Sequence, residues 1–154
     1  MQKFGFRLES VLNLKSQLED NAKNTLAGST RELESQKNCL EDLKNINDGS
    51  INSLNAEIDE GISVFRIKNY NSYLAFMRKK ITDQKENVNI AEGVVDIDRE
   101  GLIKAMQGRK ILEKLKEKKY QEYVIEQNKS EQLLIDELNS FKFKDGSGEE
   151  NARD

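Results

Sequence analysis

Residues 69–112 decide the fold, and they read NYNSYLAFMRKKITDQKENVNIAEGVVDIDREGLIKAMQGRKIL. A stripe with alternating four- and three-residue steps runs through them: Tyr70, Leu74, Met77, Ile81, Gln84, Val88, Ala91, Val95, Asp98, Leu102, Ala105, Arg109 and Leu112. A repeat sustained over about six heptads separates a coiled coil from an ordinary amphipathic helix. The stripe predicts a long helix over about residues 69–143, with one side buried against a partner helix.

The preceding segment, about residues 6–60, carries a second stripe. Its members are Leu8, Val11, Lys15, Leu18, Ala22, Leu26, Ser29, Leu33, Gln36, Leu40, Leu43, Asn47, Ile51, Leu54 and Ile58, and the spacing continues to Ile62. Two successive four-residue steps, from Leu18 to Leu26, predict a stutter that locally unwinds the coiled coil. The polar members Ser29, Gln36 and Asn47 weaken the seam but help to fix its register.

The two segments are expected to pair with each other. Glycines at 93, 101 and 108 each cost a helix about 1 kcal/mol relative to alanine, which a helix held by a partner tolerates. A hinge is predicted over about residues 61–68, with Gly61 as the helix cap. Helices joined by a short connection lie antiparallel. The predicted fold is therefore all-α, an antiparallel coiled-coil hairpin forming a single domain over residues 1–143, followed by a disordered acidic tail over residues 144–154.

Composition excludes most classes of enzyme. The 154 residues include no histidine and one cysteine, Cys39, so the sequence lacks a His-based triad, a histidine metal ligand and a Cys-cluster zinc site. Glycine-rich phosphate-binding motifs are absent as well. No stretch is apolar enough to span a bilayer. We predict a cytoplasmic protein that is not an enzyme and uses no cofactor or metal.

The densest run of basic residues is RKILEKLKEKK at residues 109–119. A nucleic acid or a membrane surface is one interpretation of such a run. The interleaved Glu113 and Glu117 favour a solvated helix face with pairs four residues apart, as does the net charge of −3. We therefore predict no nucleic-acid partner and no direct membrane insertion.

Three blocks of the sequence resemble the FliJ family of the flagellar type III export apparatus. The first is FGFRLESVLNLK at 4–15, followed by Glu19, Ala22 and LA at 26–27; the second is GI at 61–62 with Arg66, NY at 69–70 and YL at 73–74; the third is EQNK at 126–129 with DE at 136–137. The third block departs from the family pattern, because Asn128 intervenes and the spacing is longer.

The resemblance implies a cytoplasmic hairpin similar to the central stalk, the γ subunit, of rotary ATPases. It implies that the paired termini dock in the hexameric flagellar export ATPase, and that the protein also contacts the FlhA export gate and export chaperones. The implied role is to promote ring assembly and to link ATP hydrolysis to export. The protein would lie peripherally at the cytoplasmic face of the membrane, through the export apparatus, and be a monomer on its own.

The resemblance also implies two sets of binding residues. The ATPase-binding set comprises Phe4, Phe6, Arg7, Leu8, Leu12, Lys15, Gln127, Lys129 and Asp136. The gate-binding set comprises Cys39, Leu43, Tyr73, Met77, Lys80 and Gln84. Spacing alone places Met77 in the seam and Tyr73 and Phe76 beside it, where exposed aromatic residues are typical of binding hot spots. Phe4 and Phe6 have two interpretations, packing on the second helix and entering the ATPase ring, and both can hold for different faces.

Two other functions remain open at this point. One is an unrelated cytoplasmic coiled-coil scaffold that forms homodimers through its seam. The other is the virulence type III secretion counterpart, which shares the expected architecture.

Overall fold

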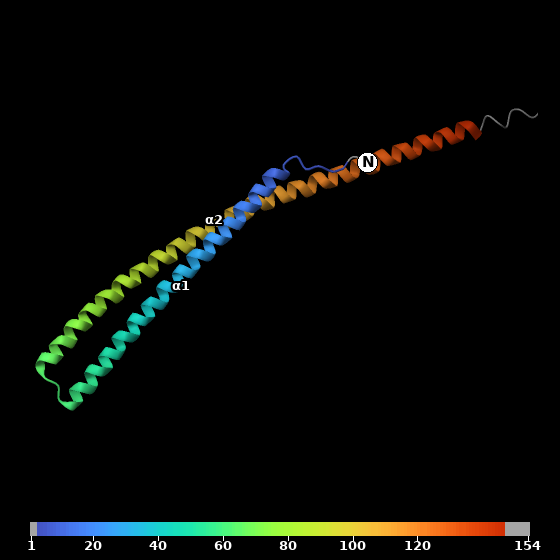
Figure 1. Ribbon diagram of the computed structural model, residues 1–154. Helices are drawn as coiled ribbons and strands as arrows, with labels where there is room; N and C mark the ends of the chain where they lie inside the picture. Colours follow the sequence, from blue (N-terminus) through green and yellow to red (C-terminus); the bar gives the residue numbers. More distant parts are fainter. Residues whose placement is uncertain (1–2, 147–154) are drawn as a thin grey trace, which may run out of the picture. The chain divides into compact units, whose positions relative to one another are not determined.

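The structure, a computed structural model, describes residues 3–146. It contains two long helices, α1 (Glu9–Glu60) and α2 (Val64–Gly146), and the described residues form no strand. The helices pack against each other as a hairpin, and Figure 1 shows the short connection between them. The all-α helical hairpin predicted from the heptad spacing is confirmed.

The connection is shorter than the expected hinge over residues 61–68. Within that range only residues 61–63 lie outside the helices, and Gly61 adopts a left-handed φ of 93° that favours glycine. Ser63 begins α2 as its N-cap, because its hydroxyl accepts a 3.4 Å hydrogen bond from the Arg66 amide. This cap gives α2 a defined start at Val64, although β-branched and aromatic residues fill the first turn.

The ends of the helices also differ from their expected positions. The carbonyl of Leu8 accepts a helical hydrogen bond from the amide of Leu12, so helix α1 begins at Glu9 and not near residue 6. Helix α2 extends to Gly146 and so includes the first three residues of the expected tail. The rest of that tail, residues 147–154, lies outside the described residues.

The seam of α2 lies where the heptad spacing predicts it. All thirteen residues of the predicted stripe, from Tyr70 to Leu112, are buried or half-buried. Its buried apolar core consists of Leu74, Met77, Val88, Ala91 and Val95. The register predicted for this helix is therefore correct, because every heptad of the stripe offers side chains that pack on α1.

The seam of α1 agrees with the prediction only in its middle. From Ala22 to Asn47 the predicted residues are half-buried, but towards the N-terminus Glu19 is 3% exposed whereas Leu18 is 45% exposed. The seam thus continues through Leu12 and Glu19 with regular heptad steps, and the stutter expected at Leu18 is wrong. Towards the connection, Leu54 is buried as predicted, but Ile51 and Ile58 are exposed.

Polar side chains in the seam account for these shifts. The buried carboxylate of Glu19 pairs with Lys23 at 2.8 Å, one turn away. Near the connection, Glu57 accepts hydrogen bonds from Arg66 at 3.1 Å and from the Tyr70 hydroxyl at 2.9 Å. A carboxylate with such partners can replace an apolar residue at a seam position.

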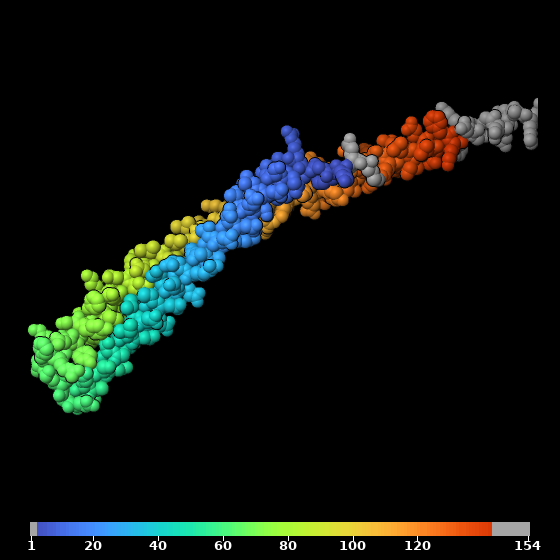
Figure 2. Space-filling model, viewed as in Figure 1, coloured from blue at the N-terminus to red at the C-terminus, as the bar shows by residue number. Residues whose placement is uncertain are grey.

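The chain divides into two compact units. Residues 16–107 form the hairpin unit, which holds the connection between the helices, and residues 1–15 with 108–154 form the terminal unit. In Figure 2 the α1 and α2 parts of the hairpin unit lie against each other. Each unit contains one of the two predicted sets of binding residues.

Candidate functional site

An aromatic cluster holds the N-terminal segment of the terminal unit on α2. The Phe4 ring lies 5.3 Å from the ring of Tyr120 in an edge-on arrangement and 5.5 Å from the ring of Tyr123. Such ring pairs stabilise by about 0.5–1.5 kcal/mol beyond the area they bury. Phe4 therefore packs on the second helix, which was one of its two interpretations. Sequence reasoning missed Tyr120, although its spacing of three residues from Tyr123 is a helix-face signal.

Charged side chains fix the same two segments to each other. Lys116 of α2 pairs with Glu9 of α1 at 2.8 Å. The aliphatic stem of Lys15 lies 3.6 Å from the position that a Cβ would take at Gly108. The seam residue Lys15 thus packs its side chain, the ammonium nitrogen at 3.9 Å included, over a residue that has no side chain.

Within the described residues, the C-terminal part of α2 has no partner helix beside it. Every residue from 128 to 142 is exposed. Its exposed large apolar residues are Leu133, Leu134, Ile135, Leu138 and Phe141. An isolated helix in water gains little from such residues, and apolar side chains gathered on an exposed helix are typical of protein-binding surfaces.

The predicted ATPase-binding residues fall into two groups. Phe4, Phe6, Leu12, Lys15 and Gln127 are half-buried, whereas Arg7, Leu8, Lys129 and Asp136 are exposed. A groove of about 710 Å³ runs beside Phe6 and Arg7, with Lys119 and Glu122 on its α2 side. The predicted ATPase-binding residues and the exposed residues 128–142 of α2 belong to the same unit. We term them together the terminal surface.

The predicted gate-binding residues divide differently. Cys39, Tyr73 and Lys80 are exposed, and the ammonium group of Lys80 lies 5.2 Å from the centre of the Phe76 ring. A cation over an aromatic face orders both side chains. Tyr73, Phe76 and Lys80 therefore form an exposed group on α2, which we term the aromatic patch.

Three members of the gate-binding set do not belong to this exposed surface. Met77 is buried and Leu43 is half-buried in the seam. Gln84 is buried too, and its amide donates to the backbone carbonyl of Gln36 at 3.0 Å and to the Gln36 side chain at 2.6 Å. These residues were assigned by family position, which does not take the seam into account. Because they pack in the seam, they offer a partner little or no surface.

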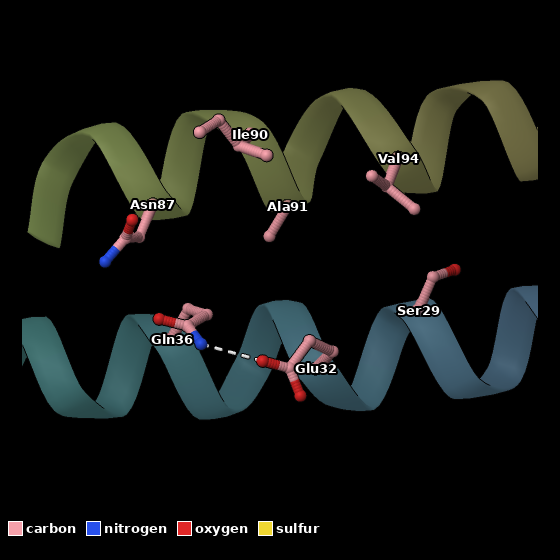
Figure 3. Close-up of a pocket in the computed structure, with 7 residues that line it drawn as sticks. All are labelled: Ser29, Glu32, Gln36, Asn87, Ile90, Ala91 and Val94. Carbon is pink, nitrogen blue, oxygen red and sulfur yellow. Dashed lines mark hydrogen bonds between the residues drawn. The ribbon is translucent and has the colours of Figure 1, made fainter.

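A groove opens beside this crossing of polar side chains. Figure 3 shows its lining, with Glu32 and Gln36 on α1 facing Asn87, Ala91 and Val94 on α2. Gln36 donates to Glu32 at 2.7 Å, and Asn87 donates to Gln84 at 3.1 Å. This groove was not predicted from the sequence, although the residues one position before each seam residue of α2 repeat with the same four- and three-residue steps.

Side-chain hydrogen bonds shift the pKa of Tyr70, Lys23 and Glu122. The bond to Glu57 raises the pKa of Tyr70, the bond to Glu19 raises the pKa of Lys23, and the bond to Lys119 lowers the pKa of Glu122. Each shift comes from an ion pair or hydrogen bond between side chains of the helices, and none lies in an enclosed pocket. Shifts of this kind stabilise structure and do not by themselves indicate catalysis.

The described part of the chain offers neither a membrane span nor a metal site. Within residues 3–146, neither helix contains a segment both long and apolar enough to cross a bilayer. No group of three metal-ligating side chains gathers among those residues.

Comparison with known proteins agrees with this fold. The family model described as "Flagellar FliJ protein" matches residues 3–148. No curated protein sequence matches the chain significantly. Among solved structures, that of a protein described as a YscO homolog, CT670 from Chlamydia trachomatis, is similar with a TM-score of 0.60 at 20% identity, over 96% of this chain and 100% of that one.

Proposed function

Because the chain belongs to the flagellar FliJ protein family, we propose that it serves flagellar protein export as a stalk and export chaperone. In this role it binds the hexameric export ATPase and the FlhA export gate, promotes assembly of the ATPase ring and links ATP hydrolysis to export. It performs no catalysis itself. The family match over nearly the whole chain carries the proposal, and two exposed surfaces on separate units support it.

The terminal surface suits the ATPase. Leu134, Leu138 and Phe141 lie on a helix with no partner beside it, so a ring could enclose them without disturbing the hairpin. Arg7 and Lys129 are exposed in the same unit and are available to acidic residues of a partner. Because apolar anchors dominate binding and exposed charges steer it, the leucines are expected to matter most.

The aromatic patch suits the export gate. Tyr73 and Phe76 are exposed aromatic residues outside the seam, and aromatic residues are enriched at binding hot spots. Lys80 holds a charge over the Phe76 ring and adds a polar rim. Export chaperones are further partners in this proposal, which places the protein in the cytoplasm, peripherally at the membrane through the export apparatus.

The test is capture of the export ATPase from the same cell by the full chain. Leu134→Ala with Leu138→Ala is expected to reduce capture at least about tenfold, since truncating a hot spot costs about 2 kcal/mol or more. Ile103→Ala in the hairpin unit removes another exposed apolar side chain and is the matched control. Wild-type chain that captures no ATPase, or a double variant that captures as much as the control, would contradict the proposal.

The likeness to a YscO homolog favours one second candidate, the virulence type III secretion counterpart. Both candidates share the hairpin, so a cellular readout distinguishes them. Deleting the gene and restoring it on a plasmid is expected to abolish and then restore swimming. If swimming persists while secretion of virulence proteins stops, the virulence role replaces the flagellar one.

A further inference from the structure

A second stripe follows α2 from Gln84 to Ala105, one residue before each seam position in that range. Its members are Asp83, Asn87, Ile90, Val94, Ile97, Gly101 and Lys104. The three apolar members are left to solvent, with Ile90 59% exposed, Val94 45% and Ile97 71%. We term these seven residues the outer stripe. Three large aliphatic side chains in consecutive turns form an exposed apolar patch that needs an occupant.

The opposite flank of α2 in the same unit is mostly polar and charged, and Ile103 is its exposed large aliphatic residue. One residue after the seam, Lys37 of α1 pairs with Glu92 of α2 at 3.0 Å across the helices. On that flank Arg99 also pairs with Asp96 at 2.9 Å. Charged side chains that pair with one another keep a helix face solvated. The contrast between the flanks shows that the apolar character of the outer stripe is local and not a property of the whole helix surface.

Features inside the outer stripe remain unexplained by the hairpin. Apart from its chain neighbours and its own helix backbone, no heavy atom lies within 4 Å of the position of a Cβ at Gly101, so packing within the hairpin does not require glycine in mid-helix. Asp83 and Lys104, at the two ends, form no ion pair with any other described residue. A contact from outside the chain would account for both observations.

We propose that a second copy of this chain covers the outer stripe, with its α2 antiparallel and a two-fold axis at Val94. The order of residues in the stripe is self-complementary about that axis. Val94 meets Val94 of the second copy, Ile90 meets Ile97, and Asp83 meets Lys104. A two-fold interface repeats every such contact, so the dimer gains two Asp–Lys pairs and a continuous apolar centre.

Charge makes the antiparallel arrangement the favoured one. In a parallel pair, Asp83 would face Asp83 and Lys104 would face Lys104, and like charges across an interface repel. Glycine at 101 lets the facing helix approach closely at the end of the apolar centre. The groove of about 390 Å³ beside Val94 gives an apolar side chain of the second copy a place to enter, next to Ala91 (Figure 3).

The dimer rests on few side chains and is therefore weak. Three aliphatic residues per copy form a smaller apolar centre than obligate dimers have. The chain is then a monomer when dilute and a dimer when concentrated. The aromatic patch lies on the same face of α2 and continues the outer stripe towards the connection, whereas the terminal surface lies in the other unit. The variants at positions 83, 94 and 104 change no residue of either surface, so dimerisation is tested separately from the ATPase and gate assignments.

Sedimentation equilibrium of the full chain, from low micromolar to near-millimolar concentration, tests the proposal. The average mass is expected to rise from that of a monomer towards that of a dimer. Val94→Glu places two carboxylates at the axis and is expected to weaken dimerisation at least about tenfold. Ile103→Glu makes a matching change on the ion-paired flank and should leave the mass curve unchanged. Circular dichroism confirms that both variants keep the helical content, since both positions are exposed.

A charge exchange tests the direction of the helices. Asp83→Lys and Lys104→Asp are each expected to weaken the dimer, and the double variant is expected to restore it, because only the antiparallel arrangement brings these two positions together. A monomer at every concentration would overturn the proposal and leave the stripe to a different partner. Dimerisation that is unchanged by Val94→Glu, or that is not restored in the double variant, would overturn the proposal as well.

Discussion

Two neighbouring residues of α2, Tyr73 and Leu74, separate binding from stability. Leu74 is 5% exposed in the seam, whereas Tyr73 is 42% exposed in the aromatic patch. Leu74→Ala is expected to lower the free energy of unfolding by about 2–5 kcal/mol through the cavity it leaves. Tyr73→Ala should change it by no more than about 0.5 kcal/mol. Chemical denaturation of both variants checks the difference.

The same pair tests the gate assignment. Tyr73→Ala, alone or with Lys80→Ala, is expected to weaken binding to the cytoplasmic part of the export gate while the chain stays folded. Equal loss of stability in both single variants would mean that Tyr73 packs in the hairpin, and undiminished gate binding by the folded double variant would remove the aromatic patch from the proposed function.

Tyr70 makes stability depend on alkaline pH. Its hydroxyl donates to Glu57 at 2.9 Å, and this hydrogen bond raises its pKa above the ordinary value of about 10. The stabilisation is therefore fully present below about pH 10 and is lost as the pH rises through the raised value. A spectrophotometric titration should show phenolate appearing late. Tyr70→Phe is expected to remove that late component, and Glu57→Gln to move it towards about 10; a late component that survives Tyr70→Phe would assign it elsewhere.

At the scale of the helices, spacing was enough for α2 and not for α1. Every heptad of α2 between Tyr70 and Leu112 holds a residue that packs in the seam, so counting located it. At the ends of α1, large apolar residues such as Leu18 lie one residue away from seam carboxylates such as Glu19. Counting apolar residues therefore chose the wrong neighbour, because a carboxylate that pairs with a lysine one turn away can occupy a seam position.

The polar residue Asn47 tests how much an unpaired polar side chain costs the seam in stability. Its side-chain oxygen is buried and has no hydrogen-bond partner among the described residues. Asn47→Leu is expected to raise the free energy of unfolding by about 1–2 kcal/mol, because an unsatisfied polar atom is replaced by an apolar one. Asn52→Leu, on an exposed position of the same helix, is the control and should change it little. A destabilised Asn47→Leu variant would show that the amide has a partner that stabilises the hairpin.

At the scale of the whole chain, the candidate surfaces were predicted less well than the fold. Family position alone assigned Tyr73 and Lys80 to the gate together with Met77 and Gln84, and the seam divides these four into two exposed and two buried residues. The outer stripe was not predicted, since its apolar residues attract notice only once the seam beside them is located. Surfaces depend on which face remains after packing, and that requires the register of both helices.

The unpartnered end of α2 gives the last prediction. Residues 128–142 are all exposed, so their removal takes no side chain from the packed part of the hairpin. Deleting residues 128–154 is expected to leave the melting temperature nearly unchanged, to lower the helical signal per molecule and to abolish capture of the export ATPase. A longer deletion, from residue 116, also removes Tyr120 and Tyr123, against which Phe4 packs, and Lys116, which pairs with Glu9, and it should lower the melting temperature. If the shorter deletion melts as early as the longer one, the end of α2 stabilises the hairpin, and if it still captures the ATPase, the binding surface lies elsewhere in the terminal unit.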